Sequence, residues 1–131
     1  MSTFVKQSGM TTDHVDWGSI GWRVRPENTG CKSFVVMDVG LDPGFGHDFH
    51  QHPEQDELIT VLAGRIEQWI DREKTILDVG DSVYLDRDVV HASFNVGDVP
   101  ARLFVVLAAS VGDEGYQLVD VSAEEPWNGL R

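Results

Sequence analysis

The sequence predicts an all-β fold, and three observations support this prediction. Short segments rich in β-branched and aromatic residues are separated by turns built from Gly, Pro, Asp and Asn. No segment repeats its apolar residues at helical spacing. The length of 131 residues suffices for one hydrophobic core, and a hydrophobic fraction of 41% is ordinary for a globular protein. We therefore expect one domain over residues 1–131, a β-sandwich or barrel whose core spans residues 17–121, between a polar N-terminal arm and an acidic C-terminal tail.

Strands are expected where apolar residues alternate with polar ones or run together between turns. Residues 1–16 are polar and are expected to form a loosely held arm in which His14 is solvated. Residues 26–32 are expected to form a turn, and a tight hairpin is expected at Ala63-Gly64. The run over residues 101–110 is the most continuous apolar segment, which is typical of a strand covered on both faces. The expected strands span residues 17–25, 33–41, 48–52, 58–63, 65–71, 75–79, 82–86, 89–96, 101–110 and, last, 116–121.

The charge and the cysteine content limit the functions that the protein can have. The formal net charge is −12, from 22 acidic and 10 basic residues. This balance argues against nucleic acids and anionic membranes as partners and favours cations. The one cysteine, Cys31, excludes an intramolecular disulfide and is expected to lie in a turn. Without a charged-then-apolar signal segment or a long apolar span, a cytoplasmic location is expected.

A metal site is indicated by the stretch from Gly44 to Gly64. His50 and His52 are two residues apart, which places both side chains on one face of a β-strand. Glu57 can return from the next strand, and His91 is the obvious fourth donor. These donors suit divalent Fe, Mn, Ni, Co, Cu or Zn and leave one or two coordination positions open. The sequence therefore predicts one divalent transition metal ion bound by the three histidines and the glutamate. In the alternative, the histidines are hydrogen-bonded core residues of a metal-free barrel.

The spacing of these residues resembles the two sequence motifs of the cupin superfamily. The first motif is a glycine, five residues, His-x-His, three or four residues, a glutamate, six residues and a glycine. This chain matches it throughout, at Gly44, His50, His52, Glu57 and Gly64. The second motif is matched at Gly80, His91 and Asn95. Asp86 and Asp88 stand where that motif usually has proline and glycine. Both are expected to be solvated turn residues; alternatively, they orient the nearby histidine or add negative potential near the metal.

The resemblance implies a double-stranded β-helix, or jelly-roll barrel, with the metal inside it. It implies the same four ligands, and a catalytic role for Glu57, which could move between metal ligand and base. Gly44, Gly64 and Gly80 are implied to be turn residues. Asn95 is implied to be a structural residue. Because small cupins commonly pair, the resemblance also implies a homodimer.

The residues around the ligands are assigned from their positions in the sequence alone. His47 lies three residues before His50, so an extended strand would point it to the opposite face, and a solvated loop position is expected; alternatively, it has a role at the mouth of the pocket. Gln55 lies in the loop between the ligands and is expected either to reach the open face of the metal or to face solvent. Six aromatic residues are candidates for the core or the cavity lining: Phe45, Phe49, Trp69, Tyr84, Phe94 and Phe104.

Two classes of function are compatible with this site. In the first, the protein is an enzyme whose metal binds a small organic substrate, with dioxygenase-like oxidation as the favoured reaction and decarboxylation or isomerisation as alternatives. In the second, the barrel binds a small molecule or a metal in a regulatory role without turnover. The four intact ligands favour the enzyme, whereas a fold alone does not determine a reaction.

Overall fold

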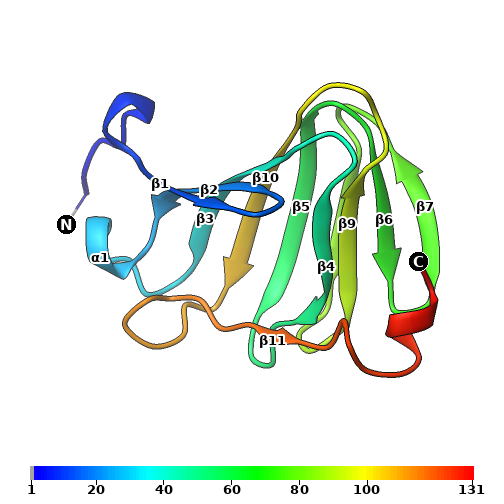
Figure 1. Cartoon of the computed structure of the whole chain (residues 1–131). Helices are drawn as coiled ribbons and strands as arrows, with labels where there is room; N and C mark the ends of the chain where they lie inside the picture. Colours follow the sequence, from blue (N-terminus) through cyan, green and yellow to red (C-terminus); the bar gives the residue numbers. More distant parts are fainter. Residues whose placement is uncertain (1) are drawn as a thin grey trace.

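Residues 2–131 are described by a computed structural model that consists mostly of β-strands (Figure 1). Eleven strands, one α-helix and two 3-10 helices follow one another along the chain. In chain order they are η1 (Gln7–Gly9), β1 (Thr11–Val15), β2 (Gly18–Val24), α1 (Pro26–Thr29), β3 (Val35–Leu41), β4 (Gly46–Gln51), β5 (Asp56–Ala63), β6 (Ile66–Ile70), β7 (Glu73–Leu77), β8 (Ser82–Leu85), β9 (His91–Asn95), β10 (Ala101–Ala108), β11 (Val119–Asp120) and η2 (Trp127–Gly129).

The strands form two antiparallel sheets. Sheet A has the strand order β1-β2-β3-β10-β5-β8, and sheet B has the order β11-β4-β9-β6-β7. Several strands that lie side by side are distant in the sequence, such as β3 with β10 and β4 with β9. Figure 1 shows the two sheets curving around a common interior, with η1 and the C-terminal segment outside it. This arrangement confirms the predicted all-β jelly-roll fold.

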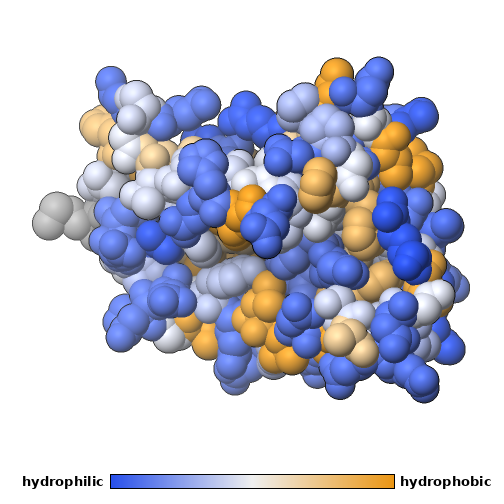
Figure 2. Space-filling model, viewed as in Figure 1, coloured by the Kyte–Doolittle hydropathy of each residue, from blue (hydrophilic) through white to orange (hydrophobic). Residues whose placement is uncertain are grey.

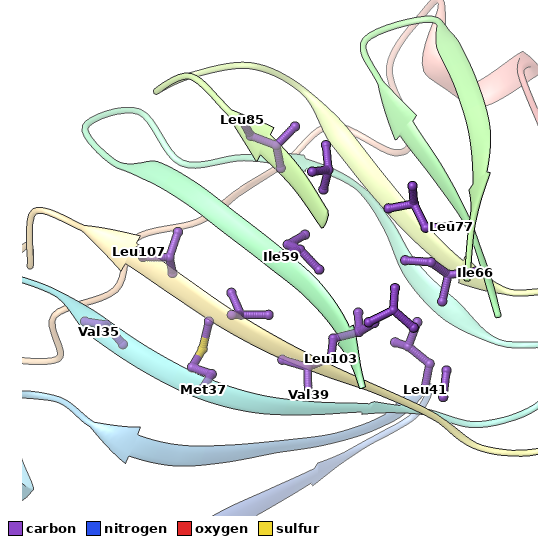
Figure 3. Packing of buried hydrophobic residues seen from close by; sticks show 14 of the residues in the cluster. Val35, Met37, Val39, Leu41, Ile59, Ile66, Leu77, Leu85, Leu103 and Leu107 are labelled. Atoms are coloured by element: carbon purple, nitrogen blue, oxygen red, sulfur yellow. The ribbon is translucent and has the colours of Figure 1, made fainter. Parts of the chain in front are cut away.

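The main hydrophobic core fills the space between the two sheets (Figure 3). Alternate residues of β3, β5 and β10 point into this space, as the period of two along a strand requires. Full burial of each such side chain contributes about 1.5–3 kcal/mol to folding. Sheet A supplies most of the core, and Ile66 and Leu77 join it from sheet B. The members from sheet A include Val35, Met37, Val39, Leu41, Ile59, Val61, Val83, Leu85, Leu103, Val105 and Leu107.

A second, smaller hydrophobic cluster lies on the outer face of sheet B. Phe49, Trp69 and Phe94 belong to it, and the rings of Phe49 and Trp69 meet edge to face with centroids 5.4 Å apart. Trp127 and Leu130 of the C-terminal segment pack against this cluster. The acidic tail therefore covers part of the outer face of sheet B. Three of the six aromatic candidates, Phe49, Trp69 and Phe94, are core residues.

The other three aromatic candidates belong neither to the two hydrophobic clusters nor to the lining of the pocket, contrary to prediction. Phe45 and Tyr84 are 53% and 59% exposed, and Phe104 is half-buried on β10. Along β10 a buried residue alternates with an exposed or half-buried one, so the prediction that residues 101–110 are covered on both faces is wrong. The outer face of an antiparallel sheet commonly faces water, even when its residues are apolar. Figure 2 shows that the surface on the side viewed is mostly hydrophilic, with hydrophobic residues in small separate groups.

The N-terminal segment is more ordered than its composition indicates. Residues 11–15 form β1 and pair antiparallel with β2, so the prediction of a loosely held arm is wrong for them. All five residues of β1 are exposed, and the strand lacks the apolar alternation by which strands are recognised in a sequence. His14 is solvated as predicted, but it lies in a strand rather than a loop.

Helical structure is confined to single turns. The turn predicted over residues 26–32 contains α1, which begins with Pro26 at a position where proline is favoured. It ends at Gly30, whose φ of 73° is the left-handed conformation typical after a helix. Cys31 follows in the loop and is half-buried. Within residues 2–131, no helix is long and apolar enough to cross a membrane.

The chain crosses from one sheet to the other at Gly64, so the hairpin predicted at Ala63-Gly64 is wrong. β5, before it, pairs within sheet A, and β6, after it, pairs within sheet B. Gly64 has a φ of 81°, and a Cβ atom there would lie only 2.8 Å from the Cα atom of Ala101. A glycine between two strands occurs both in a hairpin and where the chain crosses from one sheet to another. The two cases differ only in which strands pair with the two segments, and those partners are distant in the sequence.

Candidate metal centre

Three buried histidines converge between the two sheets. His50 on β4 and His91 on β9 form a cross-strand pair, and His52 follows the end of β4. The three side chains offer ring nitrogens that all lie within 4.8 Å of one another. Each of the three residues is at most 4% exposed. The group could therefore hold a metal ion that is shielded from bulk water.

A backbone carbonyl orients each of these histidines. The Nδ1 atom of His50 lies 2.7 Å from the oxygen of Asp48, that of His52 lies 2.6 Å from the oxygen of Gln117, and that of His91 lies 3.0 Å from the oxygen of Val89. Because a carbonyl oxygen only accepts hydrogen bonds, each Nδ1 carries a proton and donates it. In a neutral imidazole the Nε2 atom then keeps a free lone pair, which is the arrangement that metal-binding histidines use.

Glu57 faces these histidines from the opposite sheet. It lies on β5 and is 5% exposed. Its Oε1 atom is 2.7 Å from Nε2 of His91 and 3.4 Å from Nε2 of His52. Neither Oε1 of Glu57 nor Nε2 of His91 makes a hydrogen bond of acceptable geometry. A buried carboxylate oxygen that faces imidazole lone pairs requires a cation or a proton beside it, so the residues present fit a divalent metal ion.

The electrostatics of the cluster keep Glu57 ionised. Burial alone would raise the pKa of Glu57, but His91 and His52 outweigh this and hold the pKa well below its usual value. Burial lowers the pKa of His50 well below its ordinary value, so this ring stays neutral. Burial also lowers the pKa of His91, but the carboxylate of Glu57 produces a net increase. The pKa shifts of Glu57 and His91 thus both favour a positive charge beside the carboxylate, which a bound divalent cation would supply.

His47 is half-buried in the lining of the pocket, which agrees with the alternative of a role there, whereas the expected solvated position on the opposite face is wrong. In the pairing of β4 with β9, His47 is opposite Ser93 and His50 is opposite His91, so β4 has one extra residue between these pairs. This bulge turns His47 to the same face as His50, and their rings stack with centroids 3.7 Å apart. Burial lowers the pKa of His47 to about 4, so its ring is neutral at pH 7.

Gln55 neither reaches the metal cluster nor faces solvent, so both predictions for it are wrong. It is 1% exposed, and its Nε2 atom donates hydrogen bonds of 2.8 Å to the carbonyls of Ala109 and Gly115. Its Oε1 atom accepts a hydrogen bond of 3.1 Å from the backbone N–H of Gln117. The carbonyl of Gln117 is in turn the partner of His52. Gln55 therefore fixes the loop that orients one of the three histidines.

Asp86 and Asp88 are exposed, which agrees with the prediction that they are solvated turn residues. The side chain of Asp86 accepts a hydrogen bond from Tyr84, and that of Asp88 accepts one from Gln51. Asp88 has a φ of 69°, the left-handed conformation that explains why the second motif usually has a glycine there. Neither aspartate orients His91, whose Nδ1 partner is a backbone carbonyl.

Asn95 is a structural residue, as the resemblance implies. Its Nδ2 atom donates to the carbonyls of Leu41 and Val99 at 2.9 and 2.8 Å, and its Oδ1 atom accepts from the N–H of Gly97. The side chain thereby ties the end of β9 to the end of β3 and to the following turn.

The pocket around the cluster has one apolar and one polar side. Sheet A contributes the apolar wall together with Glu57, and sheet B contributes His47, His50, His91 and Ser93. The cavity has a volume of about 30 Å³. The apolar wall consists of Ile20, Met37, Val39, Leu41, Ile59, Leu103 and Val105.

Two aromatic residues that sequence reasoning did not select, Trp17 and Tyr116, complete the lining. Trp17 lies in the turn between β1 and β2, and Tyr116 lies in the loop after β10. Both stand in or beside turns, where alternation assigns no face to a side chain. The signal that could have singled them out is a large aromatic residue beside a glycine in a turn, which occurs in Trp17-Gly18 and Gly115-Tyr116.

A family model described as a cupin domain matches residues 37–107 of the chain. The chain is similar to the tetracenomycin polyketide synthase protein TcmJ of Streptomyces glaucescens, with 25% identity over 76% of this chain and 66% of that protein. It is also similar to protein SchB of Streptomyces halstedii, with 31% identity over 66% of this chain and 62% of that protein. The chain thus spans slightly less than two thirds of the length of these relatives.

Among solved structures, the fold is similar to the oxalate decarboxylase of Lactobacillus farciminis in complex with formate. The TM-score is 0.78 and the identity 15%, over 88% of this chain and 35% of that chain. At this level of identity the likeness establishes the fold and does not extend to the reaction.

Proposed function

This chain belongs to the cupin family, and from this premise we propose that it is a metal-dependent enzyme acting on a small organic molecule. The observation that carries the proposal is the convergence of three buried imidazoles and a buried carboxylate with no hydrogen-bond donor between them. Such a cluster is costly to bury without a cation, so it is difficult to explain as a structural core.

The proposed metal ligands are His50, His52, Glu57 and His91. One divalent ion held by them, whether Fe, Mn, Ni, Co, Cu or Zn, would supply Lewis acidity towards a bound oxygen atom and, if redox-active, reactivity with dioxygen. The protein itself supplies a dry pocket, fixed ligand orientations and groups that can handle a proton.

The proposed substrate is a largely apolar molecule that carries a carbonyl, enol or phenol oxygen. Its oxygen would face the polar wall of sheet B, and its carbon skeleton would contact the apolar wall of sheet A. The name of the relative TcmJ, a polyketide synthase protein, supports this class, because polyketides are rich in carbonyl and enol oxygens. The relatives extend beyond the matched region, so this support is for the substrate class and not for one compound.

Two side chains are proposed to act on the substrate. The carboxylate of Glu57, held ionised beside His91, can accept a proton from an enol or phenol. Tyr116 lines the pocket with its ring centroid 5.3 Å from that of His52. Burial raises the pKa of Tyr116, so its hydroxyl group stays protonated and can donate a hydrogen bond to a substrate oxygen.

Dioxygenase-like oxidation is the reaction to test first, and metal analysis is the first measurement. Protein purified without chelators would be analysed for metal by mass spectrometry and then assayed for oxygen uptake with flavonols, enols and polyketide-like phenols. We expect about one redox-active metal ion per chain and oxygen consumption that depends on substrate.

Each of the other possible results would support one of the alternative functions or contradict the metal site. Turnover without oxygen uptake would replace oxidation by a non-redox reaction such as decarboxylation or isomerisation. Stoichiometric metal with tight ligand binding but no turnover would identify a non-catalytic binding module. A chain that contains no metal, and takes up none when it is added, would contradict the metal site itself.

A further inference from the structure

Three aromatic rings are stacked from the surface turn of the β1–β2 hairpin to the metal cluster. The ring of Trp17 lies 4.7 Å from that of His47 at an angle of 15°, and the ring of His47 lies 3.7 Å from that of His50 at 12°. All three rings line the pocket. Trp17 therefore covers the face of His47 that points away from the candidate ligand His50, where another planar ring could stack in its place.

The cavity is too small for an organic substrate in this conformation. Its volume of about 30 Å³ has room for the metal ion and a water molecule or two. By comparison, an engineered apolar cavity that binds benzene has a volume of about 150 Å³. If the site acts on an organic molecule, a part of its lining has to move.

The two aromatic walls of the pocket differ in how firmly they are held. Tyr116 lies between Gly115 and Gln117, and the backbones of both neighbours are hydrogen-bonded to the buried side chain of Gln55. Trp17 is half-buried in a two-residue turn, next to a strand whose residues are all exposed. Its carbonyl accepts a hydrogen bond of 3.0 Å from Asp42, and its indole packs against the main core and stacks on His47. The ring of Tyr116 packs against the same core and contacts two further rings, those of Trp22 and His52. The indole of Trp17 is therefore the part of the lining that can rotate at the lowest cost.

We infer that Trp17 determines the size and shape of the molecules that reach the metal centre. Its indole rotates away from His47, and a planar ring of the substrate takes the vacated place in the stack. The ring of His47 separates a ring in this place from His50, so an oxygen substituent reaches the ligand cluster only past the edge of His47. The inference rests on the proposed function for the chemistry of the site, whereas the rotation itself can be tested without any metal.

The first test is the reactivity of the histidines in metal-free protein towards diethyl pyrocarbonate, followed residue by residue with mass spectrometry. His14 is exposed and serves as the internal reference. We expect His47 to react more slowly than His14 in the unaltered protein. Trp17→Ala should accelerate the reaction of His47 by about tenfold, because a covered ring nitrogen reacts only in open conformations. Trp17→Phe retains a stacking ring and should cause a smaller change.

Trp127→Ala is the matched control, since it removes a tryptophan from the outer face of sheet B rather than from the pocket. Its folding and that of the Trp17 variants would be checked by thermal unfolding, with Trp17→Leu as the replacement if Trp17→Ala does not fold. Equal rates at His47 in the variants of Trp17 and Trp127 would overturn the inference.

The second test measures how fast 2-naphthol, a planar phenol, associates with the metal-free protein. Trp17→Ala should raise the association rate by several-fold over the unaltered protein and over Trp127→Ala. An unchanged rate would also overturn the inference. A chain that binds no metal would instead contradict the proposed function and leave both of these measurements intact.

Discussion

The inner faces of the two sheets differ in chemistry, although they enclose the same space. Sheet A presents a continuous set of aliphatic side chains from β3, β5, β8 and β10 (Figure 3). Sheet B presents buried polar side chains from β4, β6 and β9 and becomes apolar at Ile66 and Leu77. The buried polar residues of these three strands are His50, Gln68, His91, Ser93 and Asn95.

Because of this difference, the stability of the fold depends mainly on sheet A, and the proposed metal binding depends mainly on sheet B. The polar side chains of sheet B are hydrogen-bonded: the hydroxyl of Ser93 donates to Gln68 at 2.6 Å, and the amide of Gln68 donates to the carbonyl of Trp69 at 3.1 Å. Hydrogen-bonded polar groups in a core add little net stability but impose definite positions. Glu57 is the exception on sheet A, and it faces the histidines of the other sheet. We therefore expect substitutions on sheet A to change folding and those on sheet B to change metal binding.

The largest effect is expected for Leu85→Ala on sheet A. Leu85 is 2% exposed, so its truncation leaves a cavity and should lower the free energy of unfolding by about 2–5 kcal/mol. Tyr84→Ala, in the same strand but facing solvent, should cost less than about 1 kcal/mol despite the larger side chain. Urea unfolding of both variants measures the difference. Similar losses for the two would show that the inner face of sheet A has no special role in stability.

The next effect is expected for His91→Ala on sheet B. Removing a candidate ligand should weaken metal binding by at least about 100-fold, since loss of a residue that only supports a ligand already costs 10–100-fold. His47→Ala removes an imidazole from the same pocket that is not a proposed ligand, and it should weaken binding much less. Metal titration of the two chelator-treated variants provides the comparison. Equal losses would mean that the fourth ligand has been assigned wrongly.

A smaller effect is expected for Gln55→Ala, which tests the connection between the loop and His52. The variant loses three buried hydrogen bonds. It should weaken metal binding by about tenfold, which corresponds to about 1.4 kcal/mol. Gln51→Ala, which removes a nearby amide from the surface, serves as control in the same titration. If both variants bind metal as tightly as the unaltered protein, the carbonyl of Gln117 does not orient His52.

The smallest effect is expected for Asp88→Gly in the turn before His91. Because the φ of Asp88 is 69°, glycine should relieve strain and raise the free energy of unfolding by about 0.5 kcal/mol. Asp86→Gly, two residues earlier and without a positive φ, should lower it by a similar amount. Thermal unfolding of the two variants should therefore show melting temperatures that move in opposite directions.

The sequence predicts most of the strands and the proximity of the four candidate ligands, because both depend on local spacing. His50, His52, Glu57 and His91 follow a fixed pattern along the chain, and the structure brings all four side chains together. The alternation of residues predicts the wrong face for His47, because a bulge that depends on the partner strand β9 shifts the alternation by one residue. The sequence does not predict the position of Gln55, because its partners lie more than 50 residues away, in a loop without a pattern of its own.

The Nδ1 partners of the three histidines are all main-chain carbonyls, and this has a consequence for how the protein can evolve or be redesigned. A carbonyl is present whatever side chain the residue carries. Asp48, Val89 and Gln117 can therefore be exchanged for other residues without loss of the acceptor that orients each ligand. Variation at these three positions is thus compatible with an unchanged orientation of the histidine ligands.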